Sequence, residues 1–312
     1  MNMDSKRILA VVKLNPKVKE YLDSKGYEVV GEDGIGDGGG IEVVMSSGKG
    51  RVPKALMDRL PDLKMIDNFG VGYDGVDVAE CRARGIGICV TAGVLTEDVA
   101  DLGVALALAL CRKIPQSDAF VRCGSYGEGL KPRQGVKLSG KRAGIAGLGR
   151  IGHALAQRLS GFSMKISYYD AYANEPRYQR MPDLESLARQ CDILFICAAA
   201  TPQNHNMVDA KVLNALGPSG MLVNIARGSL VDEKALCDAV TSGTIAGAAL
   251  DVYASEPNVP KELIASDRTV LTPHIASNTK ETRELMADAV ICNLKAFEER
   301  RELVNNALSP RR

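Results

Sequence analysis

The chain has 312 residues, of which 46% are hydrophobic and 25% charged, and its formal net charge at pH 7 is +1. These values are typical of a folded protein of about two domains, without the positive charge that gathers nucleic acid. The longest strongly apolar run, 104–111, is far shorter than the roughly 20 residues needed to span a bilayer. Because no secretory signal pattern precedes the first apolar run, we expect a cytoplasmic protein without membrane or nucleic-acid partners.

Short apolar runs alternate with helical patterns through the first third of the chain. We expect strands near 8–12, 28–30, 41–45, 63–66 and 87–90, and helices near 16–24, 53–59 and 78–84. This alternation predicts a small doubly wound parallel sheet. The glycine-rich segment 31–40 lacks the Lys-Ser/Thr pair of a phosphate-binding loop, so we interpret it as a surface connection.

A strongly apolar helix is predicted next. Thr96 stands where it would cap a helix over 97–112, and the part from Leu102 to Cys111 is apolar on every face. Such a helix must be buried all round. It therefore lies between domains or under a second subunit.

A glycine fingerprint stands in the middle of the chain, at Gly147-Leu148-Gly149-Arg150-Ile151-Gly152. A strand-like run over 142–146 precedes it, a helical run follows, and a second strand over 165–169 leads to Asp170. Glycines let the backbone approach a pyrophosphate, a helix N-terminus favours the anion, and the acid can accept hydrogen bonds from a ribose. The pattern predicts a dinucleotide site.

The alternation continues to the end of the chain. Further strands are expected near 192–197, 221–224, 245–250 and 269–271, with helices near 184–190, 209–216 and 233–241. The last helix is expected to open at the capping pattern Asn278-x-x-Glu281 and to run to about residue 300. We therefore predict an α/β protein with two doubly wound parallel sheets, in which a Rossmann domain (100–284) is inserted in a flavodoxin-like substrate-binding domain (1–99 plus 285–312).

Histidine and cysteine are informative through their positions. The chain has three histidines and eight cysteines. It contains no Cys-x-x-Cys pair, which is the pattern that would suggest a metal or redox site. We expect the cysteines to be reduced, buried and structural. His153 is expected on a helix surface and His205 in a polar loop, whereas His274 directly follows a predicted strand.

Three polar groups follow predicted strands in the second half of the chain: Arg227, Glu256 and His274. Each one alone could be a surface cation, a loop acid or a histidine at the edge of the core. In open α/β sheets, however, ligands bind outside the carboxyl ends of the strands. The three groups together suit hydride transfer to a 2-keto acid. Arg227 could grip the carboxylate or carbonyl, and His274 could deliver the proton while Glu256 favours its charged form.

Four motifs carry a family resemblance: Gly-Leu-Gly-Arg-Ile-Gly (147–152), Asn-Ile-Ala-Arg-Gly (224–228), Asp-Val-Tyr-Ala-Ser-Glu-Pro (251–257) and Pro-His-Ile-Ala-Ser (273–277). In their order and spacing they resemble the D-isomer-specific 2-hydroxyacid dehydrogenase family. The stretches 68–74 and 94–101 are most similar to its glyoxylate/hydroxypyruvate reductase branch. The resemblance covers nearly the whole chain and implies that Arg227, Glu256 and His274 are catalytic.

The resemblance also implies binding residues. Substrate contacts would come from the backbone amides of Val71 and Gly72, and from Ser47, Gly48 and Ser277. Cofactor contacts would come from Thr96, Gly147, Gly149, Arg150, Ile151, Gly152, Asp170, Thr201, Ala226 and Asp251. Members of the family are homodimers whose apolar helix packs across the interface, which would cover the 97–112 region.

Two departures from the reductase branch stand out. Many reductases of this branch resemble NADPH-dependent enzymes and have arginines after the second Rossmann strand. This chain has Asp170-Ala171-Tyr172 there. A 2′-phosphate would meet like charge there, so we expect NAD rather than NADP. The chain also lacks tryptophan, which some members use to close the substrate site, and Tyr126 could replace it.

Other functions stay open at this point. A 3-phosphoglycerate or D-lactate dehydrogenase would use the same scaffold, although the first usually carries a further domain for which we expect no room here. A formate dehydrogenase would carry glutamine in place of Glu256. An NAD(H)-sensing corepressor would retain the same three polar groups, but its long disordered recruitment tail is not expected here.

Overall fold

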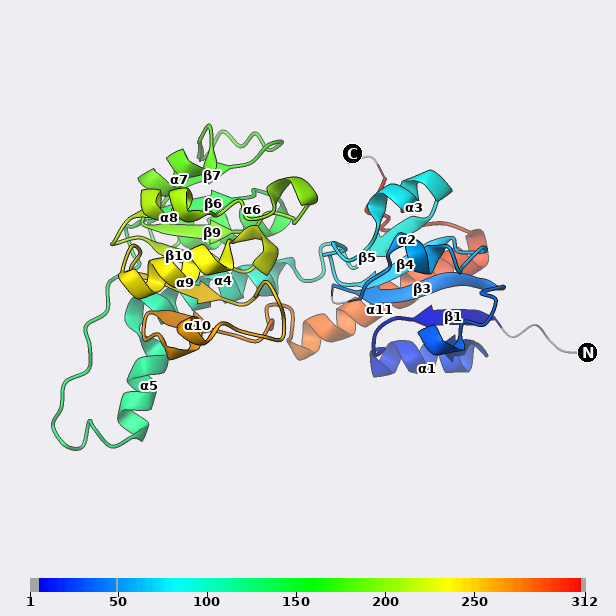
Figure 1. The fold of residues 1–312 in the computed structure, drawn as a ribbon, viewed down its shortest axis with the longest axis horizontal. Helices are drawn as coiled ribbons and strands as arrows, with labels where there is room; N and C mark the ends of the chain where they lie inside the picture. Colours follow the sequence, from blue (N-terminus) through cyan, green and yellow to red (C-terminus); the bar gives the residue numbers. More distant parts are fainter. Residues whose placement is uncertain (1–5, 49, 310–312) are drawn as a thin grey trace, which may run out of the picture. The chain divides into compact units, whose positions relative to one another are not determined.

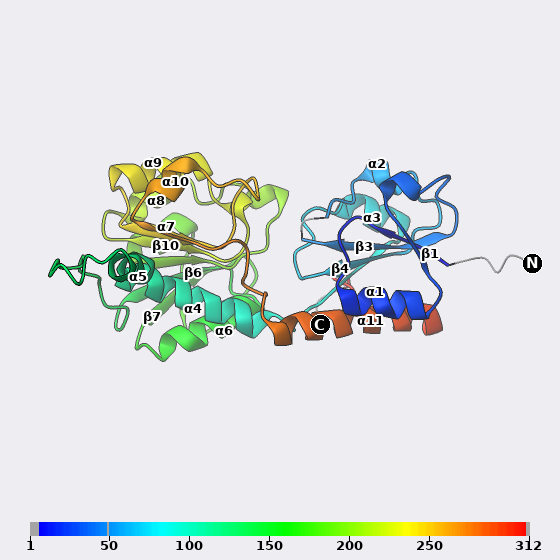
Figure 2. The ribbon, with the colours of Figure 1, turned by 90° about the horizontal axis from the view of Figure 1, so that it is seen from below.

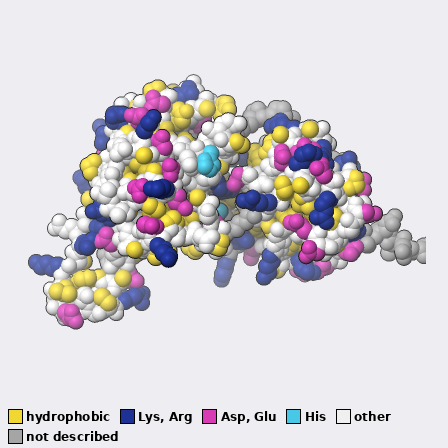
Figure 3. Space-filling model, viewed as in Figure 1, with side chains coloured by type: hydrophobic (Ala, Val, Ile, Leu, Met, Phe, Trp, Pro, Cys, Tyr) yellow, Lys and Arg dark blue, Asp and Glu magenta, His cyan; other side chains and the backbone are white. Residues whose placement is uncertain are grey.

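The structure of the protein is a computed structural model that describes residues 6–48 and 50–309. The chain divides into two compact units, which we call the first unit (1–95 with 278–312) and the second unit (96–277). Among the described residues, no helix is both long enough and apolar enough to cross a membrane. On the face in Figure 3, cationic and anionic side chains are interspersed over each unit, consistent with the net charge near zero.

The first unit is built on a parallel five-stranded sheet of order β2-β1-β3-β4-β5, which is the flavodoxin-like order (Figure 1). Its strands are β1 (Arg7–Ala10), β2 (Glu28–Val30), β3 (Ile41–Ser47), β4 (Met65–Phe69) and β5 (Gly87–Val90). Its helices are α1 (Pro16–Ser24), α2 (Lys54–Met57), α3 (Val78–Arg84) and α11 (Lys280–Arg300), with a 3-10 turn η1 (Glu32–Gly34). In Figure 2, α1 and α11 cover one face of this sheet, and α2 and α3 cover the other.

The second unit contains a parallel seven-stranded sheet of order β12-β11-β10-β9-β6-β7-β8, the Rossmann order extended by one strand. Its strands are β6 (Arg142–Ala146), β7 (Lys165–Tyr169), β8 (Gln179–Arg180), β9 (Ile193–Ile196), β10 (Met221–Asn224), β11 (Gly247–Leu250) and β12 (Thr269–Leu271). Its helices are α4 (Thr96–Arg112), α5 (Ile114–Arg122), α6 (Arg150–Ser160), α7 (Leu184–Gln190), α8 (Ala210–Leu216), α9 (Glu233–Ser242) and α10 (Lys261–Ala265). Two 3-10 turns complete it, η2 (Pro202–Asn204) and η3 (Gly228–Leu230). The predicted fold class, two doubly wound parallel sheets, is confirmed.

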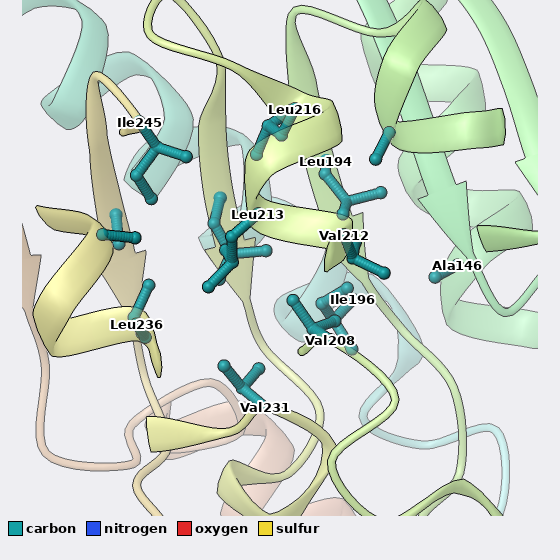
Figure 4. Packing of buried hydrophobic residues seen from close by; sticks show 14 of the residues in the cluster. Ala146, Leu194, Ile196, Val208, Val212, Leu213, Leu216, Val231, Leu236 and Ile245 are labelled. Carbon is teal, nitrogen blue, oxygen red and sulfur yellow. The ribbon is translucent and has the colours of Figure 1, made fainter. Parts of the chain in front are cut away.

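The main core of the second unit lies between its sheet and the helices α7, α8 and α9 (Figure 4). Leu194 and Ile196 of β9 point toward Val212 and Leu213 of α8 and are fully buried. Central parallel strands are covered on both faces, so their side chains are apolar without alternation. This packing fixes the strand ends that carry the candidate site.

Helix ends in both units follow local capping chemistry. Asp183, Asp209 and Asp232 cap α7, α8 and α9 by accepting backbone N–H groups of the first turn. Two expected caps were wrong. Thr96 is the first residue of α4 and not its cap, and Thr279, not Asn278, caps α11 by accepting the Thr282 N–H.

Three short elements escaped prediction, namely α5, α10 and β8. None of the residues of α5 is buried, so this helix has no apolar stripe facing a core. The expectation that all eight cysteines are buried was also wrong, because Cys123 and Cys292 are exposed.

Helix α4 is not buried on every face within the chain. Its residues Val99, Gly103, Leu106 and Leu110 face the core, while Ala105 is exposed and Leu108 half-buried. The α5 helix and the loop over 123–137, which we call the arm, extend from its end (Figure 1). Large apolar side chains of the arm are more than two-fifths exposed: Ile114 52%, Val121 58%, Tyr126 68%, Leu130 53% and Val136 42%. Figure 3 shows hydrophobic side chains gathered over this arm.

Candidate active site

The glycine fingerprint forms the turn between β6 and α6, and its three glycines are required for different reasons. Gly147 has φ +94°, and a Cβ there would lie 2.5 Å from the backbone of Ala198. A Cβ on Gly152 would lie 2.2 Å from the Gly147 carbonyl oxygen, so this glycine lets α6 pack on the turn. Gly149 is the N-cap of α6, and a Cβ there would meet no atom of the described residues within 4 Å. The room at Gly149 therefore fits a cofactor phosphate at the helix N-terminus.

These surroundings predict opposite outcomes for two alanine substitutions. Gly149→Ala should leave the free energy of unfolding within about 0.5 kcal/mol and raise the cofactor Kd at least tenfold, since the methyl group occupies only the space in front of the helix. Gly152→Ala should cost about 3 kcal/mol through overpacking against backbone. Urea unfolding and NADH fluorescence titration would measure both. Equal destabilisation by the two substitutions would contradict this division of roles.

Asp170 follows β7 and closes the turn from the other side. Its carboxylate accepts the Leu148 N–H at 2.8 Å, and the Tyr172 and Ala173 N–H groups at 2.8 Å each. Burial favours the neutral acid, but these backbone donors and the nearby Arg180 guanidinium outweigh it and lower the pKa of Asp170. The group is therefore an anion at neutral pH.

Arg227 lies just beyond the carboxyl end of β10, in a turn that Asn224 organises. The Asn224 side chain is buried, donates from Nδ2 to the Arg227 carbonyl at 2.9 Å, and accepts the Ala226 N–H at 3.0 Å. The Arg227 guanidinium is partly buried and donates to the Ala226 carbonyl at 2.7 Å. Asn224 thus fixes the backbone from which the arginine projects.

Glu256 and His274 form a direct pair. The Nδ1 atom of His274 lies 2.9 Å from Oε2 and 3.1 Å from Oε1 of Glu256, so Nδ1 carries a proton donated to the carboxylate. Glu256 also accepts the Tyr253 N–H at 3.3 Å. The carboxylate fixes the orientation of the imidazole ring, which leaves its other nitrogen, Nε2, for a reacting group.

His274 has φ +57°, a left-handed conformation that is uncommon outside glycine and asparagine. Asp251 directly follows β11 and is fully buried. It holds the loop that contains His274. One oxygen of Asp251 accepts the Thr272 hydroxyl at 2.6 Å and the Ile275 N–H at 2.8 Å, and the other accepts the Ala276 N–H at 2.9 Å. These bonds lie on both sides of the histidine in the chain and hold its backbone in the left-handed conformation.

The structure brings the three catalytic candidates to the carboxyl ends of three adjacent strands, β10, β11 and β12. Gly228, next to Arg227, packs directly on the segment that leads to Glu256, because a Cβ there would lie 1.9 Å from the Tyr253 carbonyl carbon. The Tyr253 hydroxyl in turn donates to the Thr272 carbonyl at 3.0 Å. The three loops are therefore packed against one another.

The remaining predicted binding residues divide between the units. Thr96 opens α4, Arg150 and Ile151 open α6, Thr201 caps η2, and Ser277 is the last residue of the second unit. In the first unit, Ser47 ends β3, Gly48 follows in a turn, and Val71 and Gly72 follow β4. Sequence reasoning missed the supporting roles of Asn224 and Gly228, of which only Asn224 left a signal, as a polar residue that ends a buried strand.

A dinucleotide turn on a Rossmann sheet, with an imidazole–carboxylate pair at the same sheet's carboxyl edge, defines a nicotinamide-dependent dehydrogenase as the class of protein. Residues 104–276 match the family model of the D-isomer specific 2-hydroxyacid dehydrogenase, NAD binding domain. The chain belongs to this family, and the resemblance read from the sequence is confirmed.

Relatives and solved structures support the same conclusion. The chain is 44% identical over 258 residues to a 2-ketogluconate reductase from Gluconobacter oxydans, covering 82% of this chain and 83% of the relative. It is 43% identical over 257 residues to glyoxylate/hydroxypyruvate reductase A from Arabidopsis thaliana, covering 82% of each. A solved NADPH-dependent glyoxylate/hydroxypyruvate reductase from Sinorhizobium meliloti, in complex with NADP and malonate, is 40% identical with a TM-score of 0.92, covering 98% of this chain and 97% of that one.

Proposed function

We propose that this protein is an NAD(P)-dependent reductase of small 2-keto acids, such as glyoxylate, hydroxypyruvate or pyruvate, that yields the D-hydroxy acid where the product is chiral. The observation that carries the proposal is the His274–Glu256 pair, 2.9 Å apart, beyond a sheet whose glycine turn has room for a phosphate. The relatives named as glyoxylate/hydroxypyruvate reductases support this substrate class.

In this proposal the bound nicotinamide supplies the hydride. His274 delivers a proton from Nε2 to the substrate oxygen as it becomes an alkoxide, and Glu256 stabilises the imidazolium that precedes this transfer. Arg227 holds the substrate through its guanidinium fork and polarises the carbonyl. In the oxidation direction, neutral His274 accepts the proton instead.

The two units divide the binding work. Gly147, Gly149, Arg150, Ile151 and Gly152 hold the cofactor, together with Thr96, Asp170, Thr201, Ala226 and Asp251 from the same second unit. The first unit takes the substrate carboxylate on the Val71 and Gly72 amides, and Ser47 and Gly48 line the same site. Ser277, the last residue of the second unit, is proposed as a further substrate contact.

The cofactor preference is proposed to be NAD over NADP, although the Sinorhizobium meliloti relative is NADPH-dependent. Asp170 supports this, because its ionised carboxylate accepts three backbone N–H groups and would face a 2′-phosphate with like charge. We expect kcat/KM for NADH to exceed that for NADPH at least tenfold, a difference of about 1.4 kcal/mol.

One assay tests both parts of the proposal. Oxidation of NADH and of NADPH is followed with glyoxylate, hydroxypyruvate, pyruvate and 2-ketogluconate as substrates. A higher kcat/KM with NADPH would refute the cofactor preference and leave the reductase intact. Absence of turnover on every 2-keto acid would instead favour a protein that senses NAD(H) without catalysis.

The protein is further proposed to be a homodimer. The incompletely buried face of α4 and the exposed apolar side chains of the arm support this, since exposed apolar patches commonly mark protein–protein contacts. Tyr126, 68% exposed in the arm, is the residue proposed to approach the partner's site in place of a tryptophan.

A further inference from the structure

The turn that follows β4 has an asymmetric hydrogen-bond pattern. The Gly70 carbonyl accepts the Thr91 N–H at 3.0 Å, and the Gly72 carbonyl accepts Nδ2 of Asn68 at 3.1 Å. Within the part of the chain that the structure describes, neither the Val71 nor the Gly72 N–H donates a hydrogen bond. The Gly70 and Gly72 carbonyls are therefore bonded within the protein, whereas the Val71 and Gly72 N–H groups are available to a ligand.

Asn68 is unusual as a core residue. Its side chain is fully buried, and its Oδ1 has no hydrogen-bond partner among the described residues. A buried acceptor without a partner costs stability, which an apolar side chain of the same size would avoid. Reversing the amide would direct Oδ1 at the Gly72 carbonyl oxygen, so only the present orientation makes a bond. Asn68 thus serves the turn and not the packing of the core.

The same arrangement occurs at the end of a strand in the second unit. Asn224 ends β10 and donates from Nδ2 to the Arg227 carbonyl at 2.9 Å. Each asparagine closes the turn beyond its own strand onto the strand end. In the first unit this closure requires Gly70, whose φ of +146° is unfavourable for other residues.

We propose that Asn68 is a positioning residue for the substrate: by binding the Gly72 carbonyl, it aims the Val71 and Gly72 N–H groups at the substrate carboxylate. This inference rests on the proposed function, in which these amides take the carboxylate. Asn68 fixes the peptide after Gly72, and the Thr91 N–H fixes the Gly70–Val71 peptide that carries the Val71 N–H, so the turn is held at both ends with these donors available to an anion.

The test is steady-state kinetics of Asn68→Leu, which keeps the branched shape of the side chain, removes the donor to the Gly72 carbonyl and removes the unpaired Oδ1 as well. The KM for glyoxylate and hydroxypyruvate should rise about tenfold or more, with kcat within about threefold, because binding of the carboxylate is lost equally in ground and transition states. The KM for NADH should not change. The Ki of oxamate, an unreactive carboxylate probe, should rise in parallel with the KM.

Asn293→Ala is the matched control. Asn293 is also a fully buried asparagine of the first unit, but it donates to Asp67 at 2.9 Å and accepts from Asn305 at 3.0 Å, and neither partner belongs to the turn. It should lower Tm without changing the KM of either 2-keto acid. Asn68→Leu with a lowered Tm but unchanged KM and Ki would overturn the inference.

Gly70→Ala separates this inference from the proposed function. It strains the turn directly, and among the residues that the structure describes only Asn68 Nδ2, at 3.6 Å, would contact the added methyl. If Gly70→Ala raises KM and Asn68→Leu does not, the amides bind substrate without help from Asn68. If the unmodified protein reduces no 2-keto acid, the proposed function itself fails.

Discussion

His274→Asn should lower kcat/KM for 2-keto acid reduction by about 10²- to 10⁴-fold, the usual contribution of a positioned general acid. Asparagine is the sharpest replacement, because it tolerates the left-handed backbone at φ +57° and can still donate to Glu256 in place of Nδ1. It removes only the nitrogen proposed to deliver the proton. Stopped-flow measurement of NADH oxidation would give the change, and fluorescence titration should show an unaltered NADH Kd.

Two further variants help to interpret the result for His274→Asn. His205→Asn, at an exposed loop histidine, should leave kcat/KM within about twofold. Glu256→Gln should lower kcat/KM for reduction, because the imidazole loses the carboxylate that lies 2.9 Å from Nδ1 and orients Nε2. A His274→Asn enzyme with more than a tenth of the original kcat/KM would exclude the histidine as proton donor.

The fold was predictable where burial imposes a pattern. Strand β10 has the bounds read from the sequence, because it lies inside its sheet between β11 and β9 and all of its residues are buried. Helix α5 was not predictable, since none of its residues is buried and no periodic stripe marks it. Strand β8, with two residues, is too short to carry any pattern.

The candidate site was predictable in its members but not in its supports. Arg227, Glu256 and His274 follow strands that an open parallel sheet brings to one edge, so their proximity follows from topology. The contact of Gly228 with Tyr253 joins positions distant in sequence, and nothing in the local pattern of either residue indicates it. The same holds for Asp251, which the family resemblance implies as a cofactor contact and which the structure also shows binding the His274 loop.

Asp251→Ala should combine a loss of stability with a loss of catalysis. It leaves the Ile275 and Ala276 N–H groups without their acceptors, at about 1–3 kcal/mol each, so the free energy of unfolding should fall by about 2–6 kcal/mol. Because those two bonds hold the loop around His274, kcat should fall at least 100-fold as well. Urea unfolding and steady-state kinetics at saturating NADH would measure the two effects.

Asp209→Ala is the control for the stability term. Asp209 also accepts two backbone N–H groups, from Lys211 and Val212, but at the N-terminus of α8 and away from the site. Its loss should cost about 1 kcal/mol, as for other helix caps, and leave kcat unchanged.

Asp251→Asn then separates the effect of side-chain shape from the effect of the hydrogen bonds that Asp251 accepts. It keeps the volume and one carbonyl oxygen for Ile275, but it directs an NH₂ group at the Ala276 N–H, which cannot accept. If the left-handed backbone of His274 matters for proton delivery, this variant should retain more stability than Asp251→Ala yet lose kcat by a similar factor. If Asp251→Asn keeps full kcat, His274 works without that constraint, and the contribution of Asp251 is confined to stability and cofactor binding.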